Sequence, residues 1–474
     1  MMKAIRFFLF LLLCHTLTYA TTPPVTTLHV KVNILPTYSG MINLNTLDSK
    51  SDLCKGEMFF LDKSKPVAVF SRPLAAATQI MSLNGCSLLT NAGDQVNLEL
   101  FPLYRGTEVI QGRFRPVCSG KEGARQVLPY QIDSLYSKAD LTAITTTQQA
   151  TDFITATTAK VAKLISAAKV INPENLAALQ SFEQSKQLLF KFNFLDAHKE
   201  LARTKEIGDW YLSGFDIAAP GLSAIGDDEL SRQTTHLWCT GRKMQDSIMT
   251  EATQTQEILL LCKANRIKTR VGIDWLALEG RTNAFTPDMK QIYPLIKEAV
   301  KYNPQATRTL DSLYQSYQQM TPGTPAYNFA LENDKGEVVR LSDLKGKIVI
   351  LDIWAMWCTS CVASLPHFRE LADSYKDKKD IIFLTIAWED PSSANRAKLK
   401  QFSVEHKIDG ANNLFLTADR TDPQGKAFVE RYCMTGITRW VAIDQDGNIM
   451  NGNLGHPLVE GFDQKIANCY QKRK

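Results

Sequence analysis

The strongest chemical signal in the sequence is a pair of cysteines, Cys358 and Cys361, separated by two residues. The apolar run 347–353 before them predicts a buried β-strand, and the residues from Cys358 to about Tyr375 predict a helix. At the first turn of a helix, unpaired backbone N–H groups and the helix dipole stabilise the thiolate of the first cysteine. We therefore expect Cys358 to be the nucleophile and the more covered Cys361 to be the resolving thiol of a redox-active disulfide.

Two other interpretations of the pair stay open. Half of a zinc site would need a second Cys/His pair, and His367, six residues beyond Cys361, has no partner motif. A structural disulfide without turnover is the other interpretation. A peroxiredoxin centre is excluded, because Leu351 and Ala355 stand where its proline and its threonine or serine would precede Cys358. We expect no metal ion and no cofactor.

The run from Val349 to Cys361 resembles the buried strand and redox motif of thioredoxins. The strand at 328–331 and the turn at 345–347 are similar to those of TlpA/ResA-type exported thiol–disulfide oxidoreductases. The resemblance covers about 150 residues, from Thr324 to the C-terminus. It implies a thioredoxin-like α/β fold and thiol–disulfide exchange as the activity.

The resemblance also implies a proton relay and a substrate surface. Members of this family carry a buried carboxylate on the active-site strand, and Asp352 occupies the matching position. Burial raises the pKa of a carboxyl group, so Asp352 is expected to pass a proton to or from the resolving sulfur. The alternative is a strand-end residue whose carboxylate is satisfied by the backbone. Trp357 resembles a packing aromatic of the family that also contributes to the substrate surface.

Two positions depart from the family pattern. The family places a cis-proline opposite the disulfide, in a loop that holds the substrate backbone, and Thr438 stands at that position after Ile437. We expect Ile437 and Thr438 to contact substrate. A non-prolyl cis bond costs about 2.5–4 kcal/mol, so the sequence leaves open whether this bond is cis or trans. Ser364 stands where these proteins often carry a glutamate, which leaves the reduction potential open.

Residues 1–20 have the pattern of a secretory signal peptide, with two basic residues, a short apolar run and small residues at the exit. The apolar run is shorter than the roughly 20 residues that a spanning helix needs. Cys14 raises a lipoprotein option, but Leu13 fills a position where that processing prefers a small residue. We therefore expect a soluble exported protein in the periplasm or cell envelope.

Three regions are expected after the leader. Short alternating runs and turn formers in 21–126 predict an antiparallel, β-sandwich-like domain. Helical periodicity predicts a helical domain over 127–320, and the thioredoxin-like domain follows at 321–474. The turn-rich segment 321–325 is expected to link the last two.

Three helix starts are marked by a capping residue followed by proline. They are Asn172-Pro173, Thr286-Pro287 and Asn303-Pro304. The aromatic-rich stretch 188–195 is expected to be a buried core segment rather than a binding groove.

The composition is that of an ordinary globular chain with room for two to four domains, since 474 residues are 44% hydrophobic and 22% charged. The 54 basic and 49 acidic side chains give a formal charge of +5. Such a small excess gives no electrostatic reason to expect binding to nucleic acid or to an anionic membrane.

Besides the leader cysteine and the active pair, seven of the ten cysteines remain, so at least one cannot pair within the chain. Cys239 and Cys262 are plausible partners for a bridge between helices. Cys433 is expected either to be a buried thiol or to exchange with the active pair.

The family resemblance implies exchange with exported protein substrates that carry thiols or disulfides. It also implies that the protein acts as a reductant, recharged by an electron donor in the membrane. The alternative is a scaffold protein that binds partners without turnover. Thr438 favours this alternative, whereas the two cysteines and Asp352 argue against it.

Overall fold

The computed structural model describes most of the chain. The described residues are 26–33, 41–47, 54–60, 67–74, 78–105, 108–170, 172–201, 203–226, 228–408, 410–419, 421–434 and 436–472. The expected signal peptide and Cys14 lie outside these residues. The chain divides into two compact units. The first comprises the residues up to Met249 with Leu261–Ile267, and the second comprises Thr250–Leu260 with Lys268–Lys474.

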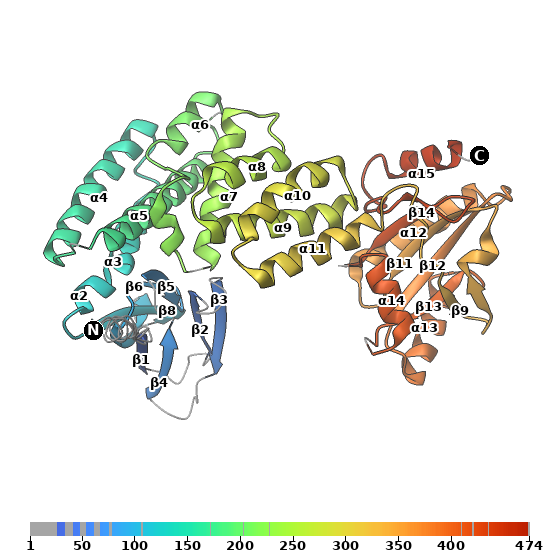
Figure 1. Ribbon diagram of the computed structural model, residues 1–474, viewed down its shortest axis with the longest axis horizontal. Helices are drawn as coiled ribbons and strands as arrows, with labels where there is room; N and C mark the ends of the chain where they lie inside the picture. Colours follow the sequence, from blue (N-terminus) through green and yellow to red (C-terminus); the bar gives the residue numbers. More distant parts are fainter. Residues whose placement is uncertain are drawn as a thin grey trace, which may run out of the picture. The chain divides into compact units, whose positions relative to one another are not determined.

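The described strands of the first unit form two four-stranded sheets, with the orders β4-β1-β7-β8 and β3-β2-β5-β6 (Figure 1). The strands are β1 (Thr26–Asn33), β2 (Met41–Leu47), β3 (Cys54–Phe60), β4 (Val67–Leu74), β5 (Gln79–Leu83), β6 (Cys86–Thr90), β7 (Gln95–Arg105) and β8 (Glu108–Ser119). Side chains of both sheets, including Val30 and Leu44, form one buried apolar core. The expected strand-rich N-terminal region is present, but its pairing is not antiparallel throughout, because β1 pairs with β7 in parallel.

Helices complete the first unit. They are α2 (Gly123–Gln126), α3 (Leu128–Tyr136), α4 (Thr147–Ala167), α5 (Pro173–Ala197), α6 (Lys205–Leu212), the 3₁₀ helix η1 (Pro220–Ala224) and α7 (Asp228–Gln245). The Asn172 side chain accepts the N–H groups of Glu174 and Asn175, so the predicted start of α5 is confirmed. In 188–195, Leu188, Phe190 and Phe194 are buried, as predicted for a core segment.

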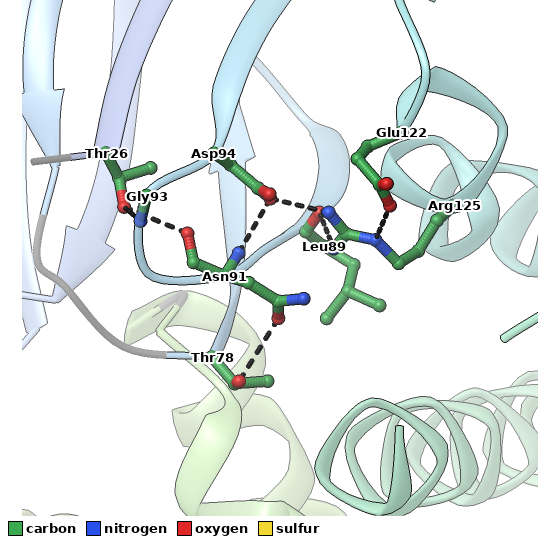
Figure 2. Close-up of polar contacts among 8 residues, drawn as sticks. All are labelled: Thr26, Thr78, Leu89, Asn91, Gly93, Asp94, Glu122 and Arg125. Atoms are coloured by element: carbon green, nitrogen blue, oxygen red, sulfur yellow. Dashed lines mark hydrogen bonds and ion pairs between the residues drawn. The ribbon is translucent and has the colours of Figure 1, made fainter. Parts of the chain in front are cut away.

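A buried arginine ties α2 to the sandwich. Figure 2 shows the Arg125 guanidinium between two carboxylates, with Nη2 at 2.7 Å from Asp94 Oδ2 and Nε at 3.0 Å from Glu122 Oε2. Asp94 also accepts the N–H of Asn91 at 2.8 Å, which holds the turn between β6 and β7. Only 6% of Arg125 is exposed, so its partners replace the water that the charge has lost.

Replacing Arg125 with methionine is expected to destabilise the sandwich by about 3 kcal/mol, because the Asp94 carboxylate, only 10% exposed, loses its counter-ion. Glu122→Gln is the control. Its side chain is 46% exposed, and the change should cost less than about 1 kcal/mol. Hydrogen exchange of the β5–β7 amides in the full chain measures both effects. Equal protection in the two variants would contradict the prediction.

The second unit opens with helices α8 (Glu251–Leu261), α9 (Asn265–Asn283), α10 (Pro287–Val300) and α11 (Pro304–Gln318), of which α8 and α9 each have some residues in the first unit. Thr286 accepts the N–H of Met289, and Asn303 accepts that of Ala306, which confirms both predicted helix starts. In the part of the chain that is described, no helix has the length and apolar character needed to cross a membrane.

A described seven-stranded sheet follows, in the order β10-β9-β13-β12-β11-β14-β15 (Figure 1). The strands are β9 (Ala330–Asn333), β10 (Val338–Arg340), β11 (Ile348–Trp354), β12 (Ile381–Glu389), β13 (Asn413–Thr417), β14 (Arg439–Ile443) and β15 (Ile449–Asn451), and the 3₁₀ helix η2 (Leu341–Leu344) follows β10. The central strand β11 is parallel to β12 and antiparallel to β14. Every residue of β11 is buried because helices cover both faces of the sheet.

The covering helices are α12 (Thr359–Ser374), α13 (Ser393–Glu405), α14 (Pro423–Arg431) and α15 (Phe462–Gln471). On one face Ile348 and Ile350 share a cluster with side chains of α12 and α15. On the other face Val349 and Leu351 share a cluster with Phe428 of α14. This α/β sandwich is the thioredoxin-like fold expected from the sequence.

Helices α9–α11 share a core with this sheet, because Leu276, Ile296 and Leu310 belong to the same apolar cluster as Val349. The segment 321–325 is held against β15, where Gly323 N–H donates to Ile449 O at 2.8 Å. The expected boundary near residue 320 therefore lies inside the second compact unit.

Candidate active site

The cysteine pair lies where β11 gives way to α12. Cys358 is the N-cap of α12 and is joined to Cys361 by a disulfide, the only one within the described residues. The Cys361 N–H donates to Cys358 Sγ at 3.3 Å. Cys358 is 8% exposed and Cys361 is fully buried. Cys358 Sγ is thus the more accessible sulfur, and it accepts an N–H of the first turn of α12. Both the N–H and the helix dipole favour a thiolate at Cys358 after reduction.

Asp352 is fully buried on β11, on the same face of the sheet as Ile350 and Trp354. This is the face that α12 covers. Burial raises the pKa of Asp352 to about 8, because the ionised form has lost its water. Neither carboxyl oxygen has a hydrogen-bond partner among the described residues. The backbone-satisfied alternative is therefore wrong, and the group can change charge near neutral pH.

The loop before β14 borders the pair. The Ile437–Thr438 peptide bond is cis, which answers the question left open by the sequence. Ile437 packs against the apolar cluster that contains Cys358 and Cys361. The Thr438 hydroxyl lies close enough to the Asp352 carboxyl to oppose the rise in its pKa, although it completes no hydrogen bond to either oxygen. The structure thus brings the disulfide, the carboxyl group and this loop together.

The two tryptophans before the pair differ in exposure. Trp354 is fully buried, and its ring packs against Phe402 with the ring centroids 5.5 Å apart. Trp357, directly before Cys358, is 65% exposed. The structure therefore places a large exposed aromatic side chain beside the disulfide.

Sequence reasoning missed Glu389 at the end of β12. Its carboxylate is 3% exposed and accepts the Met356 N–H at 2.5 Å and Asn395 Nδ2–H at 3.3 Å. Glu389 therefore holds the turn that leads from β11 to Cys358. An acidic residue directly after a buried apolar strand was the available signal, because the carboxyl ends of parallel strands meet at one edge of a sheet.

Two other residues near the pair have local partners. The Ser364 hydroxyl is buried and donates to Cys361 O at 2.8 Å, inside α12. His367 Nε2 lies 2.7 Å from Asp463 Oδ1 of α15. Within the described ranges, no cluster of three or more His, Cys, Asp or Glu side chains is arranged to hold a metal ion.

Of the other cysteines, Cys433 lies nearest to the site in sequence. It is buried, its thiol donates to Ser316 O of α11 at 2.6 Å, and burial raises its pKa to about 12. Such a thiol forms little thiolate at neutral pH, so it is poorly suited to exchange with the active pair. The suggested bridge between Cys239 and Cys262 is not formed.

Comparisons with known proteins find relatives of the C-terminal region. Residues 321–467 match the Redoxin family model. The ResA thiol–disulfide oxidoreductase of Bacillus thuringiensis subsp. konkukian is 30% identical over 159 residues, which are 33% of this chain and 84% of the relative. ResA of Bacillus cereus is 26% identical over 163 residues, 33% of this chain and 87% of the relative. The solved structure of a candidate thiol–disulfide oxidoreductase from Bacteroides vulgatus is 28% identical, covers 32% of this chain and 98% of that chain, and has a TM-score of 0.27.

The fold and the family match define a thioredoxin-like oxidoreductase in the C-terminal region. Through this region the chain belongs to the family of ResA thiol–disulfide oxidoreductases.

Proposed function

We propose that this chain is an exported thiol–disulfide oxidoreductase that exchanges disulfides with protein partners through Cys358 and Cys361. The observation that carries the proposal is the disulfide at the N-terminus of α12, with one partly accessible sulfur and one fully buried sulfur. This arrangement suits an attacking thiol and a resolving thiol. The exposed Trp357 and the loop at Ile437 and Thr438 would contact the partner beside them.

In the reducing direction, the Cys358 thiolate attacks one sulfur of a partner disulfide. A Cys358–partner disulfide forms, and the other partner cysteine leaves as a thiolate. Cys361 then loses its proton and attacks Cys358 Sγ, so the second partner cysteine leaves and the Cys358–Cys361 disulfide forms. Two electrons pass from the pair to the partner.

Asp352 would accept the proton that Cys361 loses and return it when the pair is reduced again. A carboxyl group with a pKa of about 8 supports this role, because both of its protonation states are populated near neutral pH. Glu389 would position Cys358 by holding the Met356 N–H, without touching substrate.

Export to the periplasm or cell envelope is supported by the signal-peptide pattern of residues 1–20. We propose the reducing direction because the resemblance to TlpA/ResA-type proteins implies it. A membrane electron donor would then re-reduce the Cys358–Cys361 disulfide between cycles.

The test is the reduction potential of the pair in the exported chain, from residue 21 to the C-terminus. This protein is equilibrated across thiol/disulfide buffers, the free thiols are alkylated, and mass spectrometry reads the Cys358–Cys361 peptide. A reversible two-electron couple near about −270 mV supports a reductant, whereas a value near about −120 mV indicates an oxidant. A pair that stays oxidised across all buffers would overturn the oxidoreductase proposal.

A further inference from the structure

Two neighbouring side chains, Asp352 and Thr438, leave three buried oxygen atoms without hydrogen-bond partners. They are Oδ1 and Oδ2 of Asp352 and the hydroxyl oxygen of Thr438, all unpartnered within the residues that the structure describes. Buried polar groups in folded proteins are nearly always hydrogen-bonded, since an unpaired one costs about 1–3 kcal/mol. An unpaired carboxyl group facing an unpaired hydroxyl is therefore a functional candidate.

The strand register explains why these groups meet. Asp352 of β11 lies opposite Trp440 of β14, and Ile353 lies opposite Arg439. Thr438 directly precedes β14, and extending the register by one residue makes it the diagonal neighbour of Asp352 on the same face of the sheet. Arg439 lies on the opposite face, where its guanidinium donates to Gly452 O and Cys433 O.

We propose that the Thr438 hydroxyl is the hydrogen-bonding partner of the Asp352 carboxyl and is a positioning residue for its proton. When Asp352 is ionised, the hydroxyl donates to the carboxylate. When Asp352 is protonated, the carboxyl O–H donates to the hydroxyl oxygen. A hydroxyl group can serve both states by rotating, whereas the proline that the family carries here can serve neither.

The consequence rests on the proposed role of Asp352 in thiol–disulfide exchange. In the resolving step the Cys361 S–H bond breaks, an O–H bond forms on Asp352, and the sulfur keeps the electron pair. A donor to the ionised carboxylate lowers the pKa of that carboxyl group. Thr438 thus limits the increase in the Asp352 pKa that burial causes. A smaller increase keeps Asp352 able to accept the Cys361 proton near neutral pH.

Among the described residues, the titratable groups on the face of the sheet that Asp352 shares include Cys358, Cys361 and, at the end of β12, Glu389. The Glu389 carboxylate accepts the Met356 N–H. In the oxidised protein neither sulfur titrates. A change at Thr438 should therefore be visible as a change in the ionisation of Asp352 itself.

The test compares Thr438→Val, which removes the hydroxyl while keeping the branched shape, with Thr438→Ser, which keeps the hydroxyl. Ionisation of Asp352 is followed by infrared difference spectroscopy of the oxidised full-length protein across pH, and Asp352→Asn identifies its carboxyl band. We expect the midpoint to rise by about one pH unit in Thr438→Val and to stay within a few tenths of the parent in Thr438→Ser.

Equal midpoints in Thr438→Val and the parent protein would overturn the proposal, and so would an equal shift in Thr438→Ser and Thr438→Val. If Thr438→Val does not fold, Thr438→Ala removes the same hydroxyl without a branched side chain and is read in the same way. The carboxyl titration needs no catalysis. A pair that fails to exchange disulfides would thus defeat the proposed function while leaving this measurement interpretable.

The kinetic consequence is read separately in the mixed disulfide, in which Cys361 is a free thiol. The pH profile of the resolving step, measured on a preformed mixed disulfide at Cys358, should move in Thr438→Val by the same interval as the titration midpoint. A profile that does not move while the midpoint does would separate the hydrogen bond from the reaction and would overturn the positioning role.

Discussion

Replacing Cys361 with serine is expected to trap the protein in mixed disulfides, whereas replacing Cys358 reduces exchange to the uncatalysed background. Cys358 is the more accessible sulfur and lies at the N-terminus of α12, where a thiolate is stabilised. Cys361 is fully buried directly behind it and can reach only the mixed disulfide. Without this second thiol, the partner stays attached until an external thiol releases it.

The measurement is a non-reducing gel of full-length Cys361→Ser expressed with its leader, followed by mass spectrometry of the trapped adducts. Cys433→Ser is the matched control, because this buried thiol donates to Ser316 O and a serine hydroxyl can replace that hydrogen bond. The control should retain parental turnover. Adducts that form through Cys433, or a Cys358→Ser variant that still exchanges disulfides, would contradict the assignment of the nucleophile.

Replacing Asp352 with asparagine is expected to make the protein more stable at neutral pH and a slower enzyme. In the folded state the Asp352 pKa is about 8, above the ordinary value of 3.8 for the unfolded chain. Below about pH 4 the group is neutral in both states, and its burial has no ionisation cost. As pH rises from 4 to 8 only the unfolded chain ionises, so the free energy of unfolding falls by about 1.4 kcal/mol per pH unit.

The stability of Asp352→Asn relative to the parent should therefore increase by about 4 kcal/mol between pH 4 and pH 7. Urea unfolding of the oxidised proteins, followed by the fluorescence of the buried Trp354 and Trp440, measures this difference. Because the comparison is made at two pH values, any constant cost of burying the asparagine amide cancels. A difference that is independent of pH would show that Asp352 titrates alike in both states.

The rate effect of Asp352→Asn follows from the loss of the proton acceptor. We expect disulfide exchange at pH 7 to slow by about a hundredfold, in the range typical of general acid–base groups. Single-turnover release of a partner from the Cys358 mixed disulfide isolates the step concerned. A parental release rate in this variant would mean that solvent, rather than Asp352, takes the Cys361 proton.

Features that depend on neighbouring residues could be predicted from the sequence. The helix starts at Asn172, Thr286 and Asn303 rely on a side chain that caps the next turn. The Cys-x-x-Cys pair relies on the strand and helix directly beside it. In contrast, β13 (Asn413–Thr417) and α14 (Pro423–Arg431) were not predicted, because short segments carry too little periodicity to be distinguished from loops.

The sequence by itself determined that Cys358 and Cys361 lie at the start of a helix after a buried strand, and hence the class of chemistry. Only the tertiary structure decided that Thr438 faces Asp352 and that Glu389 holds Met356. It also decided that α11 shares a core with the C-terminal sheet and that β1 pairs with β7 in parallel. These contacts join residues far apart in the chain. The order and register of the strands determine these contacts. Order and register in turn depend on burying an entire face of each sheet, which no local sequence pattern specifies.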